Sequence, residues 1–210
     1  MIRRRRAVQN SQEGWNKYAK GIPAAVAGSS IARALLIPRG DVISRLLKMG
    51  PGKSYLDIGC NTAAYARLLA TRADAPFPVT VDISRKASPD LLAWPESLPF
   101  SDGTFDCVTS LHLIRRLEDD VVEAFASELA RVLAPQGNAI VLDFGPVKSR
   151  KLNCLHKYLL STGSSEVELR GWGRLGALFA EKGFLSIELL ELGPYVIPPI
   201  PRTAVLLRKR

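Results

Sequence analysis

The stretch SYLDIGCNTA, residues 54–63, decides the fold that we expect of this chain. It joins an apolar run of strand length, which contains the carboxylate Asp57, to a glycine turn at Gly59. Small and apolar residues follow from Ala63 to Ala70, a pattern typical of a helix start. A helix N-terminus presents unpaired N–H groups, and a glycine lets a ligand approach the backbone. The stretch therefore predicts a ligand cradle in an α/β fold.

The charges around this loop narrow the choice of ligand. Residues 54–63 contain no Lys or Arg, and Asp57 would repel a pyrophosphate while attracting an ammonium group. A ligand with an adenosine and an amino-acid end fits better than a dinucleotide. A second acid, Asp82, closes the next apolar run, residues 78–82. A carboxylate at this interval is placed to bind the two ribose hydroxyls; the alternative is that Asp82 caps the turn at Ser84.

The remainder of the chain alternates between strand and helix patterns. This alternation predicts a doubly wound sheet, and the proline-rich link near the end predicts an antiparallel pair of strands at its edge. Trp15 and Tyr18 share one face of a helix expected at residues 11–20. The expected strands are 91–93, 105–114, 139–142, 185–192 and 203–207, and the expected helices are 41–48, 62–72, 118–133, 148–160 and 172–182.

Charge is distributed unevenly along the 210 residues, whose net charge is +9. Residues 1–50 carry ten Lys/Arg against two acids, and residues 202–210 carry four Lys/Arg and no acid, so the part between them is slightly acidic. We interpret residues 1–50 as a basic helical extension and residues 51–210 as the domain. The basic ends favour RNA or an anionic surface as a partner; a solvated tail and an organelle-targeting segment are the alternatives.

Other sequence features restrict the class of protein. No apolar stretch reaches the ~18 residues that span a bilayer. Cys60, Cys107 and Cys154 are odd in number and widely spaced, which indicates neither a disulfide framework nor a zinc site. We therefore expect an intracellular, reducing compartment, with the cytoplasm preferred and the mitochondrion as the alternative.

Five motifs, taken in order, give the chain its resemblance to a known family. It resembles the class I S-adenosylmethionine-dependent methyltransferases over residues 50–207. This resemblance implies a Rossmann-like seven-stranded sheet with an antiparallel last strand, and S-adenosyl-L-methionine as cofactor. The motifs are LDIGC at 56–60, VDIS at 81–84, LPFSDGTFD at 98–106, ELARVLAPQG at 128–137 and EKGF at 181–184.

The resemblance also assigns roles to single positions. Asp57 and Gly59 would hold the methionine end of the cofactor, Asp82 its ribose, and Ser110 and Leu111 would lie below the sulfonium. The other expected cofactor contacts are Cys60, Asn61, Ala63, Ile83 and Trp94.

At four places the chain departs from the family pattern, and one of them is that the helix between strands two and three is almost absent. Asn61 and Ala63 replace two glycines of the loop, and Trp94 replaces the acid that meets the adenine amino group, where it either stacks on adenine or fills its place. Arg115 and Arg116 replace a polar pair after strand four; they either bind an anionic acceptor or lie at the surface.

His112 is the histidine placed where a general base could reach the acceptor, the alternative being a packed residue. Two functions follow. The first is methyl transfer to a small molecule or lipid. The second is a catalytically inactive relative that acts as a structural or RNA-binding component of a ribonucleoprotein.

Overall fold

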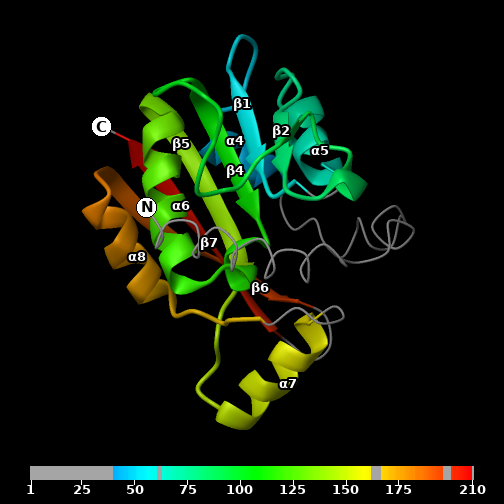
Figure 1. Ribbon diagram of the computed structural model, residues 1–210, viewed down its shortest axis with the longest axis vertical. Helices are drawn as coiled ribbons and strands as arrows, with labels where there is room; N and C mark the ends of the chain where they lie inside the picture. The colour runs from blue at the N-terminus through cyan, green and yellow to red at the C-terminus, as the bar shows by residue number, and fades with distance from the viewer. Residues whose placement is uncertain (1–39, 61–62, 162–166, 196–199, 210) are drawn as a thin grey trace, which may run out of the picture.

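The computed structural model describes residues 40–60, 63–161, 167–195 and 200–209. Its centre is a seven-stranded sheet with helices on both faces (Figure 1). The strands are β1 (Tyr55–Ile58), β2 (Val79–Asp82), β3 (Leu91–Leu92), β4 (Phe105–Leu111), β5 (Leu133–Phe144), β6 (Phe184–Tyr195) and β7 (Ile200–Lys209). The helices are α4 (Gly40–Leu46), α5 (Ala64–Arg72), α6 (Asp119–Val132), α7 (Arg150–Leu160) and α8 (Trp172–Glu181), with 3₁₀ turns η1 (Arg85–Ala87) and η2 (Ile114–Arg116).

The strand order β3-β2-β1-β4-β5-β7-β6 confirms the predicted doubly wound sheet. Strands β1 to β5 pair in parallel, whereas β7 runs antiparallel to both β5 and β6. The chain winds outward from β1 to β2 and β3, then returns to place β4 on the other side of β1. The point between β1 and β4 is therefore the switch point, at whose carboxyl end α/β sheets bind ligands.

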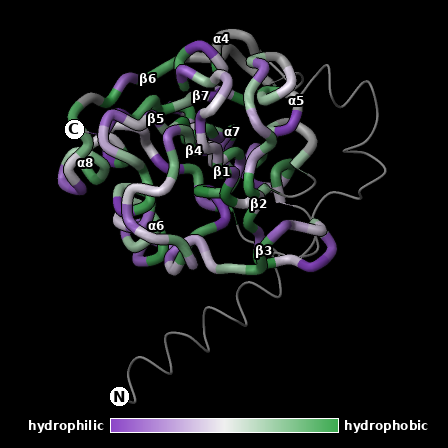
Figure 2. The backbone as a smooth tube through the Cα atoms, turned by 90° about the horizontal axis from the view of Figure 1, so that it is seen from above, coloured by the Kyte–Doolittle hydropathy of each residue, from purple (hydrophilic) through white to green (hydrophobic). Residues whose placement is uncertain are grey.

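Two apolar clusters hold helices against opposite faces of the sheet. On one face, α5 packs Ala66 and Leu69 beside Ile43 of α4 and the adjacent Leu47. On the other, α6 and α8 bury an apolar stripe that includes Phe125. Figure 2 shows the mainly hydrophobic strands between these two layers. Burying a side chain of this size contributes about 1.5–3 kcal/mol, so the strands and helices hold each other in place.

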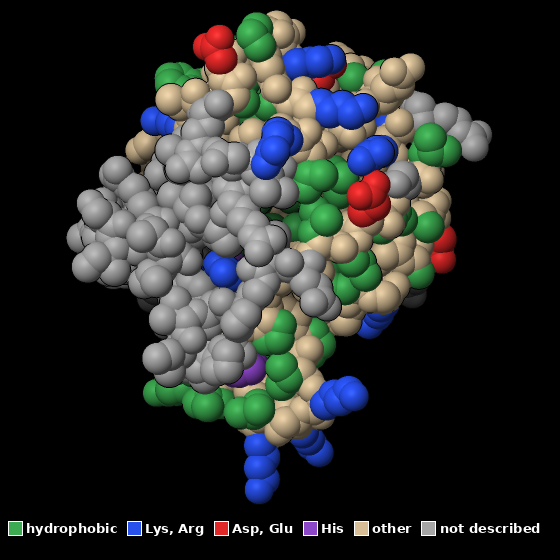
Figure 3. All heavy atoms as spheres, turned by 180° about the vertical axis from the view of Figure 1, so that it is seen from behind, with side chains coloured by type: hydrophobic (Ala, Val, Ile, Leu, Met, Phe, Trp, Pro, Cys, Tyr) green, Lys and Arg blue, Asp and Glu red, His purple; other side chains and the backbone are tan. Residues whose placement is uncertain are grey.

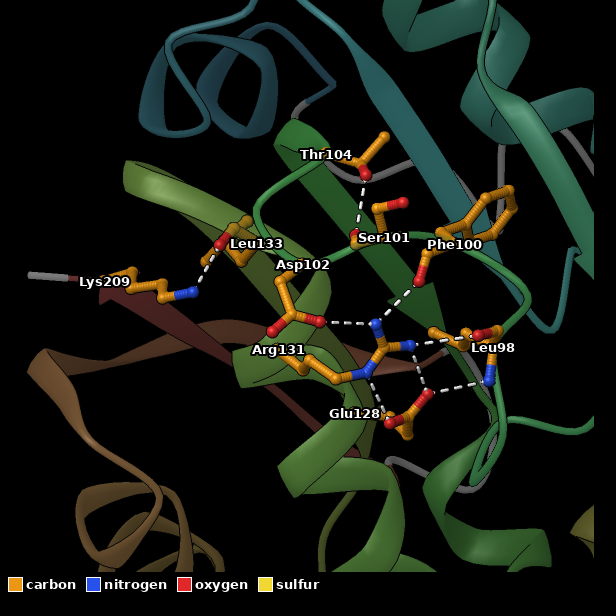
Figure 4. Close-up of polar contacts among 9 residues, drawn as sticks. All are labelled: Leu98, Phe100, Ser101, Asp102, Thr104, Glu128, Arg131, Leu133 and Lys209. Atoms are coloured by element: carbon orange, nitrogen blue, oxygen red, sulfur yellow. Dashed lines mark hydrogen bonds and ion pairs between the residues drawn. The ribbon is translucent and has the colours of Figure 1, made fainter.

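Arg131 of α6 clamps the turn that leads into β4 (Figure 4). Its guanidinium donates to the carbonyl oxygens of Phe100 and Leu98 at 2.6 and 3.0 Å, and to the Asp102 carboxylate at 2.9 Å. Glu128, one helical turn earlier, pairs with Arg131 at 2.8 Å and accepts the Leu98 N–H at 2.8 Å. The two motifs at 98–106 and 128–137 therefore form one structural unit, which fixes where β4 begins.

Several expected boundaries were wrong. β4 ends at Leu111, and residues 114–116 form the turn η2 instead of extending the strand. β5 begins at Leu133 and not at the expected residue 139. Strands β6 and β7 are also longer than expected because they pair with each other along most of their length. The helix expected at residues 11–20 lies outside the described residues.

Helix α4, which the sequence assigned to the N-terminal extension, contributes Ile43 to the core, and Leu47 beside its end does the same. The basic residues 1–39 lie outside the described part of the chain. In that described part, none of the helices combines the length and apolar character required to cross a bilayer.

Candidate functional site

Asp57 lies on β1 directly beside the switch point. Its strand neighbour on β4 is Thr109, whose hydroxyl donates to Asp57 Oδ1 at 2.6 Å. Because the Thr109 hydroxyl donates its hydrogen to the carboxylate, it acts as the acceptor of a hydrogen bond from Tyr55 Oη, which lies 2.8 Å away. All three side chains are buried. A hydrogen-bonded chain therefore fixes the orientation of the Asp57 carboxylate at the centre of the sheet.

Burial also changes the chemistry of this carboxylate. Loss of solvation and the charge of Asp82 together raise the pKa of Asp57 to about 7, although the hydrogen bond from Thr109 acts in the opposite direction. Asp57 and Asp82 are thus close enough to interact. Two carboxylates at the ends of neighbouring parallel strands form an acidic centre that suits a cationic or hydroxyl-rich ligand.

The loop after β1 has an unusual backbone. Gly59 has φ +72°, and a Cβ at this position would lie 3.1 Å from two carbon atoms of the Leu113 side chain, so both the conformation and the packing require glycine. Ala63, directly before α5, is left-handed with φ +53°, a conformation that disfavours residues with a Cβ. Cys60 is buried, which raises the pKa of its thiol. Asn61, the other replaced glycine, lies outside the described residues.

Asp82, Ile83 and Trp94 come together at the end of β2. The carbonyl of Asp82 accepts the N–H of Ala93 at 3.2 Å, which holds the segment containing Trp94 beside β2. Ile83 and Trp94 are both half-buried and pack on the same apolar cluster. Asp82 Oδ1 accepts the Ser84 N–H at 2.9 Å, so the turn cap considered as an alternative is present.

The end of β4 carries Ser110, Leu111 and His112. Ser110 is buried, and its hydroxyl has no hydrogen-bond partner. His112 has φ +62°, an uncommon conformation for a residue with a side chain and one often found at functional sites. Its N–H donates to the Leu142 carbonyl at 2.7 Å, and its ring stacks on Phe144 with centroids 4.9 Å apart. About a quarter of the side chain, 24%, stays exposed.

Arg115 and Asp143 form a buried ion pair behind His112. Arg115 Nη1 donates to Asp143 Oδ1 at 2.8 Å and to the His112 carbonyl at 2.6 Å, while Asp143 Oδ2 accepts the Arg115 N–H at 2.9 Å. The sequence placed Arg115 either at the surface or on an anionic acceptor. The surface position is wrong, because Arg115 is buried. Its guanidinium forms an ion pair with the Asp143 carboxylate. Arg116 lies at the end of η2, beside this pair.

This cluster sets the protonation of His112. Burial lowers the pKa of the imidazole, the Arg115 charge lowers it further, and Asp143 opposes both. His112 Nδ1 lies 3.7 Å from Asp143 Oδ1, too far for a hydrogen bond. The pKa of Asp143 is held well below its ordinary value by Arg115 and His112 in spite of burial. His112 is therefore neutral near pH 7 and able to accept a proton.

Sequence reasoning missed Asp143, Phe144 and Thr109. The signal for Asp143 was present, since an acid directly after the apolar run 139–142 repeats the pattern of Asp57 and Asp82. Thr109 gave no such signal, because a threonine in a strand is ordinary. The three cysteines are free, and the described residues contain no group of His, Cys, Asp and Glu side chains arranged to hold a metal ion.

Comparison with known families gives a match over most of the chain. The family model described as Methyltransferase domain matches residues 31–175. A demethylmenaquinone methyltransferase of Thermus thermophilus is 33% identical over 141 residues, which cover 53% of this chain and 63% of the relative. A 2-methyl-6-phytyl-1,4-hydroquinone methyltransferase of Synechocystis is 34% identical over 116 residues, which cover 49% of this chain and 35% of the relative. The chain therefore spans about a third to two thirds of the length of these relatives.

Solved structures share the fold. The geranyl diphosphate C-methyltransferase of Streptomyces coelicolor, in complex with Mg²⁺, geranyl diphosphate and S-adenosyl-L-homocysteine, superposes with a TM-score of 0.65. The match covers 82% of this chain and 78% of that structure, at 11% sequence identity. An identity this low establishes the architecture alone.

Proposed function

We propose that this chain, which belongs to the class I S-adenosylmethionine-dependent methyltransferases, transfers the methyl group of that cofactor to a small apolar acceptor of the quinol class. The observation that supports the proposal best is the placement of two carboxylates, Asp57 and Asp82, at the carboxyl ends of the neighbouring parallel strands β1 and β2, beside the switch point. The acceptor class is inferred from the names of the relatives, which describe methyltransferases of a menaquinone precursor and of a phytyl hydroquinone.

The residues present fit the cofactor. We assign the methionine ammonium group to Asp57, whose carboxylate is buried and accepts only the Thr109 hydroxyl among the described hydrogen bonds. We assign the ribose to Asp82, with Ile83 and Trp94 flanking the adenine. The unpartnered hydroxyl of Ser110, with Leu111 next to it, would lie below the sulfonium. S-adenosylmethionine supplies an electrophilic methyl group for an in-line displacement, so the protein mainly orients the acceptor and excludes water.

His112 is the general base in this proposal. The neutral imidazole accepts the proton of an acceptor hydroxyl, which increases the electron density on the acceptor. Asp143 and Arg115 act as positioning residues, because Arg115 binds the His112 carbonyl and Phe144 supports the ring. They hold His112 in its left-handed conformation, which turns its side chain away from the regular path of β4.

The proposal is tested by transfer of a labelled methyl group to demethylmenaquinol and to a phytyl hydroquinone. We expect the wild type to methylate at least one of them, and His112→Gln to lower kcat about a hundredfold or more, since general base catalysis contributes roughly 10²–10⁴. The dissociation constant of S-adenosylmethionine should stay unchanged in this variant. His156→Gln, which removes the other histidine of the sequence from a buried position on α7, is the matched control.

Two negative results have different meanings. Cofactor binding without transfer to any quinol would refute the acceptor class, whereas calorimetry that detects no S-adenosylmethionine binding would refute the enzyme. The second result would favour the alternative from the sequence, an inactive RNA-binding relative. That alternative rests on the altered loop, on Trp94 and on the basic ends of the chain, of which residues 1–39, Asn61 and Arg210 lie outside the described residues. The division into an extension, 1–50, and a domain, 51–210, stays a proposal as well.

Cofactor affinity should depend on pH through Asp57. Below its pKa of about 7 the carboxyl is protonated and no longer attracts the ammonium group, so we expect the association constant to fall as the pH falls from about 7 to 5.5. Above about pH 8 the cofactor's own amino group loses its proton, and affinity should fall again. Calorimetry across this range measures the profile. Asp57→Asn should bind S-adenosylmethionine weakly and lose the acid limb of the profile, which is the fall in affinity below about pH 7. If this variant keeps the acid limb unchanged, the assignment of the ammonium group to Asp57 is wrong.

The raised pKa also affects stability. Because the folded protein holds the Asp57 proton up to about pH 7, and the unfolded chain releases it near pH 4, this group favours folding most strongly at acidic pH. Its contribution to the free energy of unfolding decreases as the pH rises through that window. At neutral pH Asp57 therefore contributes less to stability than at acidic pH, which is the pattern expected of a ligand-binding carboxylate.

A further inference from the structure

Helix α7 stands at the lower end of the molecule in Figure 1, after β5 has left the sheet. It is well anchored from its inner side. The Asn153 side chain accepts the Val147 N–H and donates to the Val147 carbonyl, both at 2.8 Å, and His156 is fully buried. Lys157 pairs with Glu168 at 2.9 Å, and Ser149 caps the first turn. The helix is thus a fixed part of the fold with a defined outer face.

The outer face of α7 is apolar and exposed. Four large apolar side chains lie on it at helical spacing, which places them on one continuous stripe. Their exposed fractions are 45% for Leu152, 43% for Leu155, 76% for Tyr158 and 46% for Leu159. Figure 3 shows hydrophobic side chains gathered at this end of the molecule. Scattered single exposed leucines are ordinary, but a contiguous stripe of them marks an interaction surface.

Cations border the stripe. Lys148, Arg150 and Lys151 are exposed, and none of them forms an ion pair within the part of the chain that the structure describes. The sequence contains no acid between Asp143 and Glu166. Lys and Arg side chains project beyond the apolar group at the lower end of Figure 3. An apolar stripe with unpaired cations beside it is the composition of a helix that lies in a membrane interface.

We propose that the outer face of α7 docks on an anionic lipid surface, with Leu152, Leu155, Tyr158 and Leu159 in the acyl boundary and the three cations on the lipid headgroups. Charge complementarity selects this occupant. A second copy of the chain packed through the same stripe would add three more cations and, from this segment, no acid to neutralise any of them. Anionic lipid headgroups neutralise the same charges while the leucines leave water.

This docking would place the carboxyl end of the sheet near the membrane. β5 ends at Phe144 and α7 begins six residues later, so the helix lies at the end of the sheet where Asp143 and His112 lie. The proposal does not depend on methyl transfer, because a chain inactive toward every acceptor would still bind vesicles through α7. Its failure is therefore distinguishable from failure of the proposed function.

The test uses the full chain and vesicles of phosphatidylcholine alone or with phosphatidylglycerol. Cys154 is exposed on α7 whereas Cys60 and Cys107 are buried, so an environment-sensitive fluorophore can be attached selectively beside the stripe. We expect a blue shift of its emission with anionic vesicles and none with neutral ones. Sedimentation with the vesicles should show that Leu155→Ser with Leu159→Ser lowers the partition coefficient at least about tenfold. Replacing Lys148, Arg150 and Lys151 by Gln should lower it about a hundredfold.

Matched controls separate α7 from other apolar and basic surfaces. Phe77→Ser removes an exposed ring elsewhere, 66% exposed, and should leave the partition coefficient unchanged. Replacing Arg3 to Arg6 by Gln tests the basic N-terminus. If that variant loses binding while the α7 variants keep it, or if the label shows no blue shift, the proposal is wrong. A dimer in analytical ultracentrifugation that Leu155→Ser dissociates would show that a second copy covers the stripe and would overturn it too.

Discussion

Asp143→Ala should lower the free energy of unfolding by about 3–5 kcal/mol, the loss that follows when one partner of a buried ion pair is removed. Asp143 is buried and accepts three hydrogen bonds, from Arg115 N, Arg115 Nη1 and Phe144 N, at 2.8–2.9 Å. Without it the Arg115 guanidinium stays in the interior with no anion beside it. Urea unfolding measures the change as a lower midpoint at an unchanged m-value.

A second variant keeps this prediction testable if Asp143→Ala does not fold. The double variant Arg115→Met with Asp143→Leu removes both charges and fills the space with apolar side chains, so most of the lost stability should return. Glu168→Gln breaks the exposed pair with Lys157, whose side chains are 59% and 41% exposed, and should change stability by less than about 1 kcal/mol. A double variant less stable than Asp143→Ala would contradict an electrostatic origin of the loss.

The same ion pair gives a catalytic expectation. If Asp143 and Arg115 position His112, the double variant should fold and bind S-adenosylmethionine but have a low kcat, because nothing then holds the His112 carbonyl. A purely structural pair would lose no activity once stability is restored. The comparison of kcat with stability in one variant therefore separates the two roles.

The order of strands and helices could be predicted because its signals are local. Each signal lies within a few residues of sequence. These signals are an apolar run of strand length, a glycine at a turn, and the apolar periodicity of an amphipathic helix such as α6. The lengths of β5, β6 and β7 could not be predicted in this way. Leu133 pairs with Phe105 and Asn138 with Cys107, so residues 134–137 form an irregularity between two paired positions, and that irregularity accommodates Pro135 and Gly137.

In the candidate site too, residues with a local sequence signal were predicted, and those that depend on a distant partner were not. Asp57 and Asp82 were predicted because an acid at the end of an apolar strand is visible in the sequence, and the structure brings them close together. The burial of Arg115 was not predicted, because its partner Asp143 is 28 residues away on another element. A charged residue at a turn is usually solvated, and only the folded structure shows that this one is paired.

The backbone conformation of Ala63, before α5, bears on whether the loop binds the cofactor. Ala63 is left-handed, the conformation that glycine adopts freely. Holding an alanine in it costs about 1–2 kcal/mol. Backbone strain of this kind clusters at ligand-binding sites, which supports the proposed cofactor site.

Asp82→Ala should raise the dissociation constant of S-adenosylmethionine at least about a hundredfold, the largest effect that we expect on binding. A carboxylate that accepts both vicinal ribose hydroxyls makes two charge-assisted hydrogen bonds, each contributing roughly 1.5–3 kcal/mol. Asp82→Asn keeps an oxygen for the Ser84 N–H, now accepted at 2.9 Å, and removes only the charge, so its loss should be smaller. Isothermal titration with the cofactor and with S-adenosylhomocysteine measures both.

Asp90→Ala is the structural counterpart of this variant. Asp90 Oδ2 accepts the N–H and the hydroxyl of Thr80 on β2, at 2.8 and 2.7 Å, so its removal should lower stability without changing cofactor affinity. Equal losses of affinity in the Asp82 and Asp90 variants would mean that both act through the position of β2. A further readout distinguishes the roles: because the Asp82 charge raises the pKa of Asp57, Asp82→Ala should move the acid limb of cofactor binding to lower pH, and Asp90→Ala should leave it in place.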